Sequence, residues 1–158
     1  MKRFHPQACQ SSTDTVTAFD PNNPCLFCNP KSNEIIAETE HALLITDTYP
    51  VSPGHCLVIP KRHIKTYFEC TEAENREFRE LVLRAKQYAE EQSSPDGYNI
   101  GCNNEVAAGQ SVFHLHLHII PRYAGDVENP KGGVRWVVPK QSQYNVKGWI
   151  GGFMSWCS

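Results

Sequence analysis

The sequence predicts an α+β fold in which helices pack on a mostly antiparallel, five-stranded sheet. Two observations predict it. Short segments with strand-like alternation lie on both sides of one long segment with helical periodicity, which gives the order strands, helix, strands. In addition, a chain of 158 residues with 40% hydrophobic residues is long enough to bury one core and has the length of one domain.

The first half of the chain contains three strand candidates and the helix. The strand candidates are residues 34–37, 41–46 and 55–59, and turn-forming residues such as Pro50 and Gly54 predict an antiparallel meander. Residues 71–92 change to helical spacing and place their apolar side chains on one stripe. Thr71 and Glu74 have the spacing of a capping box, which predicts that a helix begins there and covers one face of the sheet.

Two further strand candidates follow the helix, at residues 98–102 and 113–120, and a polar loop connects them. Residues 1–20 are polar with little apolar content, which predicts a flexible N-terminal arm. Residues 21–122 are then expected to form the domain. Residues 123–158 carry the three tryptophans with little periodicity, and we expect this C-terminal tail to pack on the domain or on a dimer partner.

The charge balance excludes some classes of function. The 15 basic and 17 acidic residues give a net charge of -2, which disfavours a binder of the nucleic acid backbone or of anionic membranes. The sequence has no apolar run of the roughly 20 residues that span a bilayer, and its start lacks the apolar stretch of an export signal. We therefore expect a cytoplasmic protein. The seven cysteines are an odd number, which argues against a complete disulfide framework.

Three histidines, His114, His116 and His118, alternate with Leu115 and Leu117. Successive side chains of a strand point to opposite faces, so the alternation predicts three imidazoles on one face and the leucines in the core. Imidazoles about 7 Å apart along a strand can hold a tetrahedral anion such as phosphate. A neutral imidazole is also a good nucleophile toward phosphorus, and a protonated one can neutralise charge or donate a proton.

Two other interpretations of the histidine run stay open at this point. The run could be a half-exposed strand whose outer face happens to carry histidine, or a metal site, because an H-x-H pair on a strand can chelate zinc or iron. Phosphate chemistry has further support nearby. The loop at residues 107–111 can supply amide and hydroxyl donors, and His55 begins another strand candidate.

The run at residues 109–122, GQSVFHLHLHIIPR, resembles the signature of the histidine triad (HIT) superfamily of nucleotide hydrolases and transferases. Three more segments are similar to this family: PGHCLVIPK at residues 53–61, DGYN at 96–99 and the Cys-x-x-Cys at 25–28. The resemblance extends from about residue 25 to residue 121. GDV at 125–127 and GGVR at 132–135 are similar to the bacterial branch of dinucleoside tetraphosphate hydrolases.

The resemblance implies a catalytic role for four residues. His116 would attack the α-phosphorus and form a nucleotidyl-histidine intermediate, which water would then hydrolyse. His118 and His55 would hold the phosphate. Ser111, together with Gln110, would contact phosphate oxygens or the leaving group.

The resemblance also implies two more substrate-binding residues and a metal site. Asp47 is at the family's ribose-binding position, and Asn103 is where some members have a polar residue facing the phosphates; an ordinary turn role is the alternative for both. One branch of the family binds zinc through four residues that are all present here: Cys25, Cys28, His63 and His114. Such a closed site implies one structural zinc per chain. A reduced dithiol or a redox pair is the alternative reading of the two cysteines.

As a whole, the resemblance implies an enzyme that cleaves a dinucleoside polyphosphate such as diadenosine tetraphosphate at the α-phosphate. It also implies a purine nucleotide as substrate, a homodimer, and a magnesium ion that accompanies the polyphosphate. Two alternatives stay open. The protein could hydrolyse nucleoside phosphoramidates or adenylyl conjugates, or it could be a nucleotide-binding or sensing module with incidental slow turnover.

Overall fold

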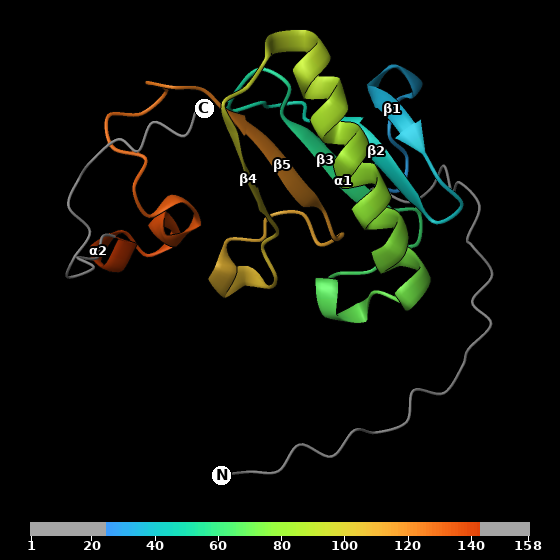
Figure 1. Ribbon diagram of the computed structural model, residues 1–158. Coiled ribbons are helices and arrows are strands. Elements are labelled where there is room, and N and C mark those ends of the chain that lie inside the picture. Colours follow the sequence, from blue (N-terminus) through green and yellow to red (C-terminus); the bar gives the residue numbers. More distant parts are fainter. Residues whose placement is uncertain (1–24, 143–158) are drawn as a thin grey trace.

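The computed structural model describes residues 25–142, and a five-stranded sheet forms its centre (Figure 1). The strands are β1 (Ile35–Glu38), β2 (Ala42–Thr46), β3 (Cys56–Pro60), β4 (Gly97–Gly101) and β5 (Leu117–Arg122). They lie in the order β1-β2-β3-β5-β4, and every neighbouring pair is antiparallel. The predicted α+β class with a five-stranded antiparallel sheet is confirmed. Two parts of the predicted organisation, the arm at 1–20 and the end of the tail at 143–158, lie outside the described residues.

A long helix, α1 (Glu72–Ser93), lies across one face of the sheet (Figure 1). The predicted capping box starts it: Glu74 N donates to the Thr71 hydroxyl at 3.2 Å, and Thr71 N donates to the Glu74 carboxylate at 2.8 Å. The predicted apolar stripe is buried against the sheet and includes Phe78, Leu81, Ala85 and Ala89. Burial of this stripe stabilises both the helix and the sheet face beneath it.

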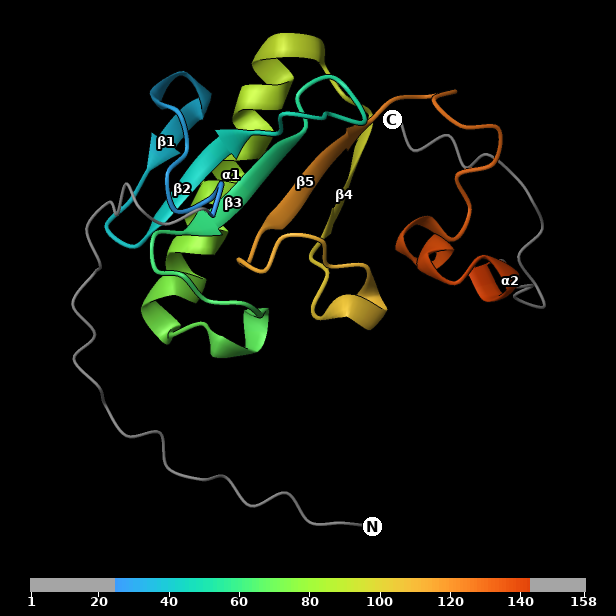
Figure 2. The ribbon, with the colours of Figure 1, turned by 180° about the vertical axis from the view of Figure 1, so that it is seen from behind.

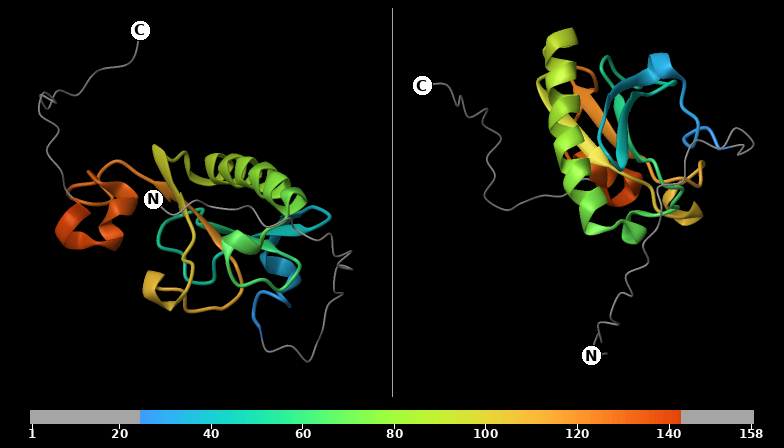
Figure 3. Two further views of the ribbon diagram at one scale, coloured as in Figure 1. Left: turned by 90° about the horizontal axis from the view of Figure 1, so that it is seen from below. Right: turned by 90° about the vertical axis from the view of Figure 1, so that its right-hand side faces the viewer.

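The face of the sheet opposite α1 carries a second apolar layer. Figures 2 and 3 show that α1 lies on one side of the sheet and leaves this other face uncovered by a long helix. The buried side chains of this layer come from β2 and β3 and are Leu43, Ile45, Leu57 and Ile59. His118 of β5 pairs directly with Leu57 of β3, and directly paired residues point to the same face. The imidazole of His118 is therefore on the face that α1 leaves open.

The last strand begins later than the sequence predicted. Residues 113–116 precede β5, because this part of the chain bonds to another segment: the Leu115 N–H donates to the Ile64 carbonyl at 2.7 Å. The alternation of side chains nevertheless continues through the irregular part. Leu115 and Ile119 are both buried in the core beneath α1, as the pattern predicted.

Residues 123–142 fold beside the edge strand β4 (Figure 1). They contain a 3-10 turn, η4 (Gly133–Val137), and a one-turn helix, α2 (Pro139–Ser142). Gly132 has a φ of 99°, and a Cβ there would lie 2.7 Å from the Ser142 carbonyl oxygen, so glycine is required at this position. Arg135 fixes the same region by donating to the carbonyls of Gln141 and Ser142.

Shorter 3-10 turns connect the other elements: η1 (Ser32–Glu34), η2 (Tyr67–Glu69) and η3 (Val106–Ala108). Within residues 25–142, every helix is too short or too polar to cross a membrane.

Candidate active site and metal centre

The three histidines of the predicted triad are divided between two neighbouring sites. The ring of His114 lies beside two cysteines, with Nδ1 at 3.4 Å from Cys25 Sγ and 3.5 Å from Cys28 Sγ. The rings of His116 and His118 lie together, with their centroids 5.0 Å apart. The triad therefore does not act as one three-histidine metal site, and each histidine has its own surroundings.

The hydrogen bond of His116 fixes which ring nitrogen carries the proton. The side chain is nearly buried, at 6% exposure, and its Nδ1 lies 2.8 Å from the His114 carbonyl oxygen. A carbonyl oxygen only accepts, so Nδ1 carries the proton. In the neutral ring, Nε2 then has a free lone pair, which is the form that a nucleophilic histidine needs.

His55 and His118 form a chain of hydrogen bonds that starts at the backbone. The Val51 N–H donates to His55 Nδ1 at 3.3 Å, so neutral His55 carries its proton on Nε2. His55 Nε2 lies 3.1 Å from His118 Nδ1 and donates to it. Neutral His118 consequently carries its proton on Nε2, where it can donate to a phosphate oxygen.

Asp47 lies beside this pair of imidazoles. Its Oδ2 is 3.5 Å from His55 Nε2 and 3.9 Å from His118 Nδ1, and its Oδ1 accepts from the Tyr49 N–H at 2.7 Å. By spacing alone, Asp47, His55 and His118 could hold a metal ion. The proton that the Val51 contact requires on His55 Nε2 makes this nitrogen a donor instead of a ligand, so the cluster does not offer a metal three free ligand atoms.

Burial keeps both histidines of this cluster neutral. It lowers the pKa of His118 to about 4, with further lowering by His116 and His55 and opposition from Asp47. Burial also lowers the pKa of His55, against the opposing effect of Asp47. Both rings are therefore uncharged near pH 7, which is the state in which the hydrogen-bond chain above assigns their protons.

The loop before the triad is held by Gln110, which is 4% exposed. Its Oε1 accepts from the Glu105 N–H at 2.9 Å, and its Nε2 donates to the Lys65 carbonyl at 2.7 Å. Glu105 has a φ of 72°, an unfavourable value for a residue other than glycine. Gln110 thus stabilises the loop, and its predicted contact with substrate stays a prediction.

Ser111 and Asn103 have free polar groups. Ser111 is exposed and Asn103 is half-buried, and neither side chain hydrogen-bonds to another residue within 25–142. Their predicted contacts with phosphate oxygens or the leaving group stay predictions.

Phe27, which was not among the predicted site residues, lies beside two histidines of the triad. Its ring centroid lies 5.1 Å from that of His116 and 6.0 Å from that of His114, so it forms an apolar wall beside both sites. A signal was present in the sequence. Phe27 lies between two expected metal ligands, and a residue in that position must come close to the first histidine of the triad if the metal site forms.

The two cysteines and two histidines of the predicted metal site are brought together. Their ligand atoms all lie within 4.8 Å of one another, and Cys28 Sγ is 3.1 Å from His63 Nδ1. Zinc bonds of about 2.3 Å to sulfur and about 2.0 Å to nitrogen place the ligands of a tetrahedral site at similar separations. The four residues therefore fit one zinc ion.

The surroundings of His114 also fit a metal ligand. Its Nε2 donates to the Pro60 carbonyl at 2.9 Å, which leaves Nδ1 unprotonated and directed at the cysteines. Burial lowers the pKa of His114 to about 4, so the ring is neutral, as ligation requires.

Comparison with known proteins finds a matching family model and several relatives in sequence. A family model described as HIT domain matches residues 29–125. A HIT-like protein of Methanocaldococcus jannaschii is 42% identical over 113 residues, which are 69% of this chain and 87% of that protein. An AP-4-A phosphorylase of Mycobacterium tuberculosis is 32% identical over 93 residues, which are 58% of this chain and 48% of that protein. An adenylylsulfatase of Arabidopsis thaliana is 36% identical over 108 residues, which are 66% and 55% of the two chains.

Solved structures share the fold. The crystal structure of a Zn-bound histidine triad family protein from Mycobacterium smegmatis matches with a TM-score of 0.59 and 35% identity, over 67% of this chain and 80% of that chain. The zinc in that protein is consistent with the cluster of two cysteines and two histidines found here.

Proposed function

This chain belongs to the HIT domain family, and from that membership we propose that it is a nucleotide hydrolase. Its substrate is a dinucleoside polyphosphate of the diadenosine tetraphosphate type, cleaved at the α-phosphate through a nucleotidyl-histidine intermediate on His116. The relative named AP-4-A phosphorylase supports this class of substrate.

One observation carries the proposal. The hydrogen bond from His116 Nδ1 to the His114 carbonyl, at 2.8 Å, leaves Nε2 as the unprotonated nitrogen. The same bond stabilises the imidazolium that forms when Nε2 bonds to phosphorus, because the Nδ1 proton keeps its acceptor.

The reaction takes two steps. In the first, His116 Nε2 forms a bond to the α-phosphorus, and the bond from that phosphorus to the bridging oxygen breaks, so the electron pair leaves with the departing nucleotide. His118 Nε2–H donates to a phosphate oxygen and offsets its charge. In the second step, a water oxygen bonds to the phosphorus and the phosphorus–nitrogen bond breaks. The nucleoside monophosphate leaves, a water proton passes to solvent, and His116 is neutral again.

The other site residues position the substrate. Asp47 accepts a hydrogen bond from a ribose hydroxyl, and Ser111 and Asn103 donate to phosphate oxygens or to the leaving group. Phe27 supplies the apolar wall on the side of the first nucleoside, where it already contacts His116.

Zinc has a structural role in this proposal. When bound by Cys25, Cys28, His63 and His114, it supplies a cross-link with four protein ligands and therefore has no position for a reactive water. The cross-link ties the segment that carries Phe27 to the start of the triad.

A second candidate function has its own support. The relative named adenylylsulfatase indicates that a chain with this fold can act on an adenylyl conjugate with a small leaving group. The same nucleophile and the same intermediate would serve, and only the leaving group would differ.

Trapping the intermediate tests the proposal. Wild-type protein mixed with diadenosine tetraphosphate and quenched within milliseconds is expected to carry one adenylyl group, and peptide mass spectrometry is expected to locate it on His116. His116→Ala should lose both the adduct and the turnover, whereas the control His41→Asn, which changes a histidine on a different part of the molecule, should keep both. An adduct on another residue would refute the nucleophile assignment, and full turnover by His116→Ala would refute the mechanism.

Four further expectations accompany this proposal. They are a purine base, a homodimer, a magnesium ion bound with the polyphosphate and a cytoplasmic location. All four stay predictions.

A further inference from the structure

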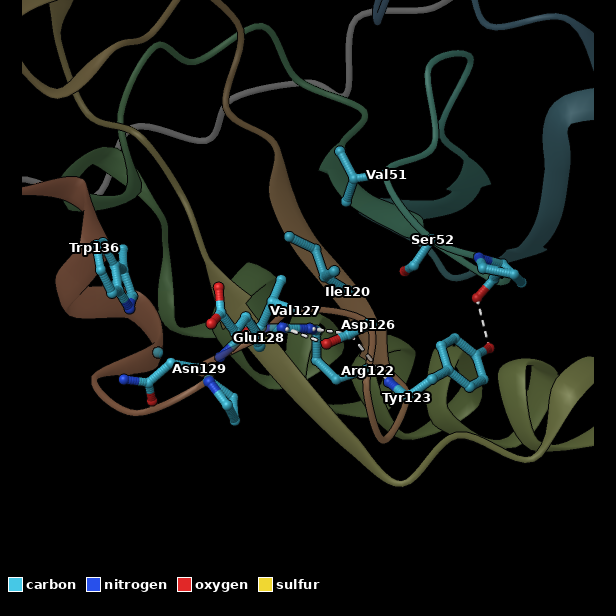
Figure 4. A pocket seen from close by; sticks show the side chains of 14 residues that line it. Val51, Ser52, Ile120, Arg122, Tyr123, Asp126, Val127, Glu128, Asn129 and Trp136 are labelled. Atoms are coloured by element: carbon cyan, nitrogen blue, oxygen red, sulfur yellow. Dashed lines mark hydrogen bonds and ion pairs between the residues drawn. The ribbon is translucent and has the colours of Figure 1, made fainter. Parts of the chain in front are cut away.

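A large cavity lies next to the histidine cluster, and the proposed chemistry does not yet use it. Its volume is about 910 Å³, which is in the range of sites for small organic ligands. One side consists of the loop at residues 51–53 and the end of β5, and the other consists of residues 126–136 (Figure 4). Asp126, Val127 and Gly133, which belong to the two glycine-containing motifs of the tail, thus line this cavity.

This cavity shares the loop at residues 51–53 with a smaller pocket that Asp47 and His55 line. Ile120 and Arg122 line the larger cavity, and they alternate with buried Ile119 and Pro121, so they point to the same face as His118. With a rise of about 3.3 Å per residue, Ile120 is about 7 Å and Arg122 about 13 Å from His118 along the strand. Several linked phosphates can bridge the distance from His118 to the near end of the cavity at Ile120, whereas a single phosphoramide group is too short.

Hydrogen bonds hold both walls in position. Ser52 Oγ donates to the Pro121 carbonyl at 2.7 Å, which fixes the loop against the end of β5. The Tyr123 hydroxyl donates to the Pro53 carbonyl at 2.9 Å and joins the tail to the same loop. The cavity is therefore formed before any ligand arrives, so little ordering is required on binding.

Trp136 provides an aromatic surface inside the cavity. Its Nε1 donates to the Lys131 carbonyl at 3.0 Å, which fixes the indole, and 42% of the residue remains exposed. Figure 4 shows its ring on the wall opposite Val51 and Ile120. A fixed aromatic face opposite aliphatic side chains is suited to stacking with a nucleobase.

The charges of the lining favour an uncharged ligand. Arg122 is paired with Asp126 through two hydrogen bonds of 2.6 and 2.8 Å, and its remaining nitrogen donates to Asn99 at 2.6 Å. Glu128 adds a second carboxylate, so one guanidinium faces two carboxylates in the lining. Such a wall repels a polyphosphate, while its carboxylate and amide groups can bond the hydroxyls of a sugar.

We propose that this cavity, between the loop at 51–53 and the tail segment at 126–136, is a subsite for the second nucleoside of the dinucleoside polyphosphate, with Trp136 stacked on its base. The inference rests on the proposed function, since it assumes that cleavage occurs at His116. It assigns the tail segment the role of selecting substrates that have a nucleoside at both ends.

The test compares two substrates in three variants. Trp136→Ala should lower kcat/KM for diadenosine tetraphosphate by about 5- to 100-fold, because stacking of a base on an aromatic side chain is lost. Its kcat/KM for adenosine phosphoramidate, which has no second nucleoside, should stay within twofold of wild type. Trp136→Phe should restore most of the loss. The matched control is Val137→Ala, which truncates the next, largely exposed residue outside the cavity and should change neither rate.

Three outcomes would overturn the inference. Equal losses for both substrates would mean that Trp136 has only a structural role. Unchanged kcat/KM for diadenosine tetraphosphate in Trp136→Ala would remove stacking as the source of selectivity. A changed oligomeric state of Trp136→Ala in light scattering, without a change in the ratio of the two rates, would identify the cavity as an interface between copies of the chain.

Failure of the inference and failure of the proposed function can be told apart. If the intermediate forms on His116 but the ratio of the two rates does not depend on Trp136, the subsite is wrong and the mechanism stands. If wild-type protein and His116→Ala hydrolyse both substrates at the same rate, the proposed function itself is wrong.

Discussion

His114 and His116 are two residues apart and both are nearly buried, yet they present opposite ring nitrogens. His114 donates from Nε2 to the Pro60 carbonyl and presents Nδ1 to the cysteines. His116 donates from Nδ1 to the His114 carbonyl and leaves Nε2 with the lone pair. In both cases a backbone carbonyl determines which ring nitrogen carries the proton. The other nitrogen of each ring then has the free lone pair.

This difference shows how one short run of chain can serve two sites. A metal ligand and a nucleophile both need a neutral imidazole with a free lone pair, so the residue type alone does not separate them. The position of the carbonyl acceptor beside each ring separates them, because it decides which nitrogen keeps the lone pair. The predictions that follow test this division, from the largest expected effect to the smallest.

The first prediction separates the two histidines by substitution to alanine. His116→Ala should reduce turnover by about 10³-fold or more and leave zinc binding unchanged, because only the proposed nucleophile is removed. His114→Ala should lose zinc binding and about 4 kcal/mol or more of stability, because a ligand of the proposed structural zinc site is removed. Metal analysis, thermal unfolding and the rate with diadenosine tetraphosphate measure the three quantities.

The control for His116→Ala and His114→Ala is a cysteine that lies outside both sites. Cys102→Ala changes a half-buried cysteine outside the ligand cluster and should leave zinc content and turnover unchanged. If His114→Ala still binds one zinc per chain, or if both alanine variants lose zinc, the division between the two histidines is wrong.

Much of the fold follows from local patterns in the sequence. The stripe that includes Phe78 and Leu81 and the capping box at Thr71 predicted α1 within a residue or so at each end, because both signals depend only on near neighbours. Leu115 was correctly expected in the core for the same reason, and Leu117 packs against this core while only partly buried. The start of β5 was predicted too early, at residue 113 instead of Leu117. A hydrogen bond from the Leu115 N–H to the carbonyl of Ile64, which is distant in the sequence, replaces the strand pairing there.

The site was predictable as a set of residues and not as a set of contacts. The resemblance gathered His55, His116 and His118, and the structure joins His55 to His118 at 3.1 Å. The protonated nitrogen of His55 is set by the Val51 N–H, and that of His116 by the His114 carbonyl. Every residue has such backbone groups, so the residue types do not reveal which of them will bond to a histidine. The cavity beside Trp136 is a further example, since it forms between segments that are about 80 residues apart.

The second prediction concerns Gln110, whose side-chain amide bonds to the backbone of Glu105 and Lys65. Gln110→Ala should destabilise the protein by about 1–3 kcal/mol, because the Glu105 N–H and the Lys65 carbonyl lose their partners in a buried place. The fall in turnover should be smaller than in His116→Ala, since the loop is loosened and no reacting group is lost. Urea unfolding and initial rates measure these effects.

The matched control for Gln110 is Gln87→Ala. Gln87 is an exposed glutamine on α1 whose amide bonds only to Glu91, so its loss should cost less than about 0.5 kcal/mol. A loss of turnover in Gln110→Ala as large as in His116→Ala, without destabilisation, would instead make Gln110 a residue that contacts substrate.

The third prediction uses His41, whose surroundings are the opposite of those of the buried histidines. Its Nδ1 lies 2.7 Å from Glu77 Oε1, and this hydrogen bond raises the pKa of His41. Because the folded pKa is above the unfolded value, the contribution to stability is fully present below about pH 6.5 and is lost as the pH rises through the folded pKa. The side chain is 29% exposed, so the effect is about 0.5 kcal/mol.

Urea unfolding of wild type and His41→Asn at about pH 5.5 and about pH 8.5 measures this contribution. The difference in unfolding free energy between the two proteins should be larger at the lower pH. Glu40→Gln is the control, because Glu40 is largely exposed and 3.9 Å from His41, and it should change the pH dependence little. An equal or larger difference at the higher pH would mean that Glu77 holds a neutral ring. His41 would then join His114 and His118 as a histidine whose hydrogen bonds, and not its charge, determine what it contributes.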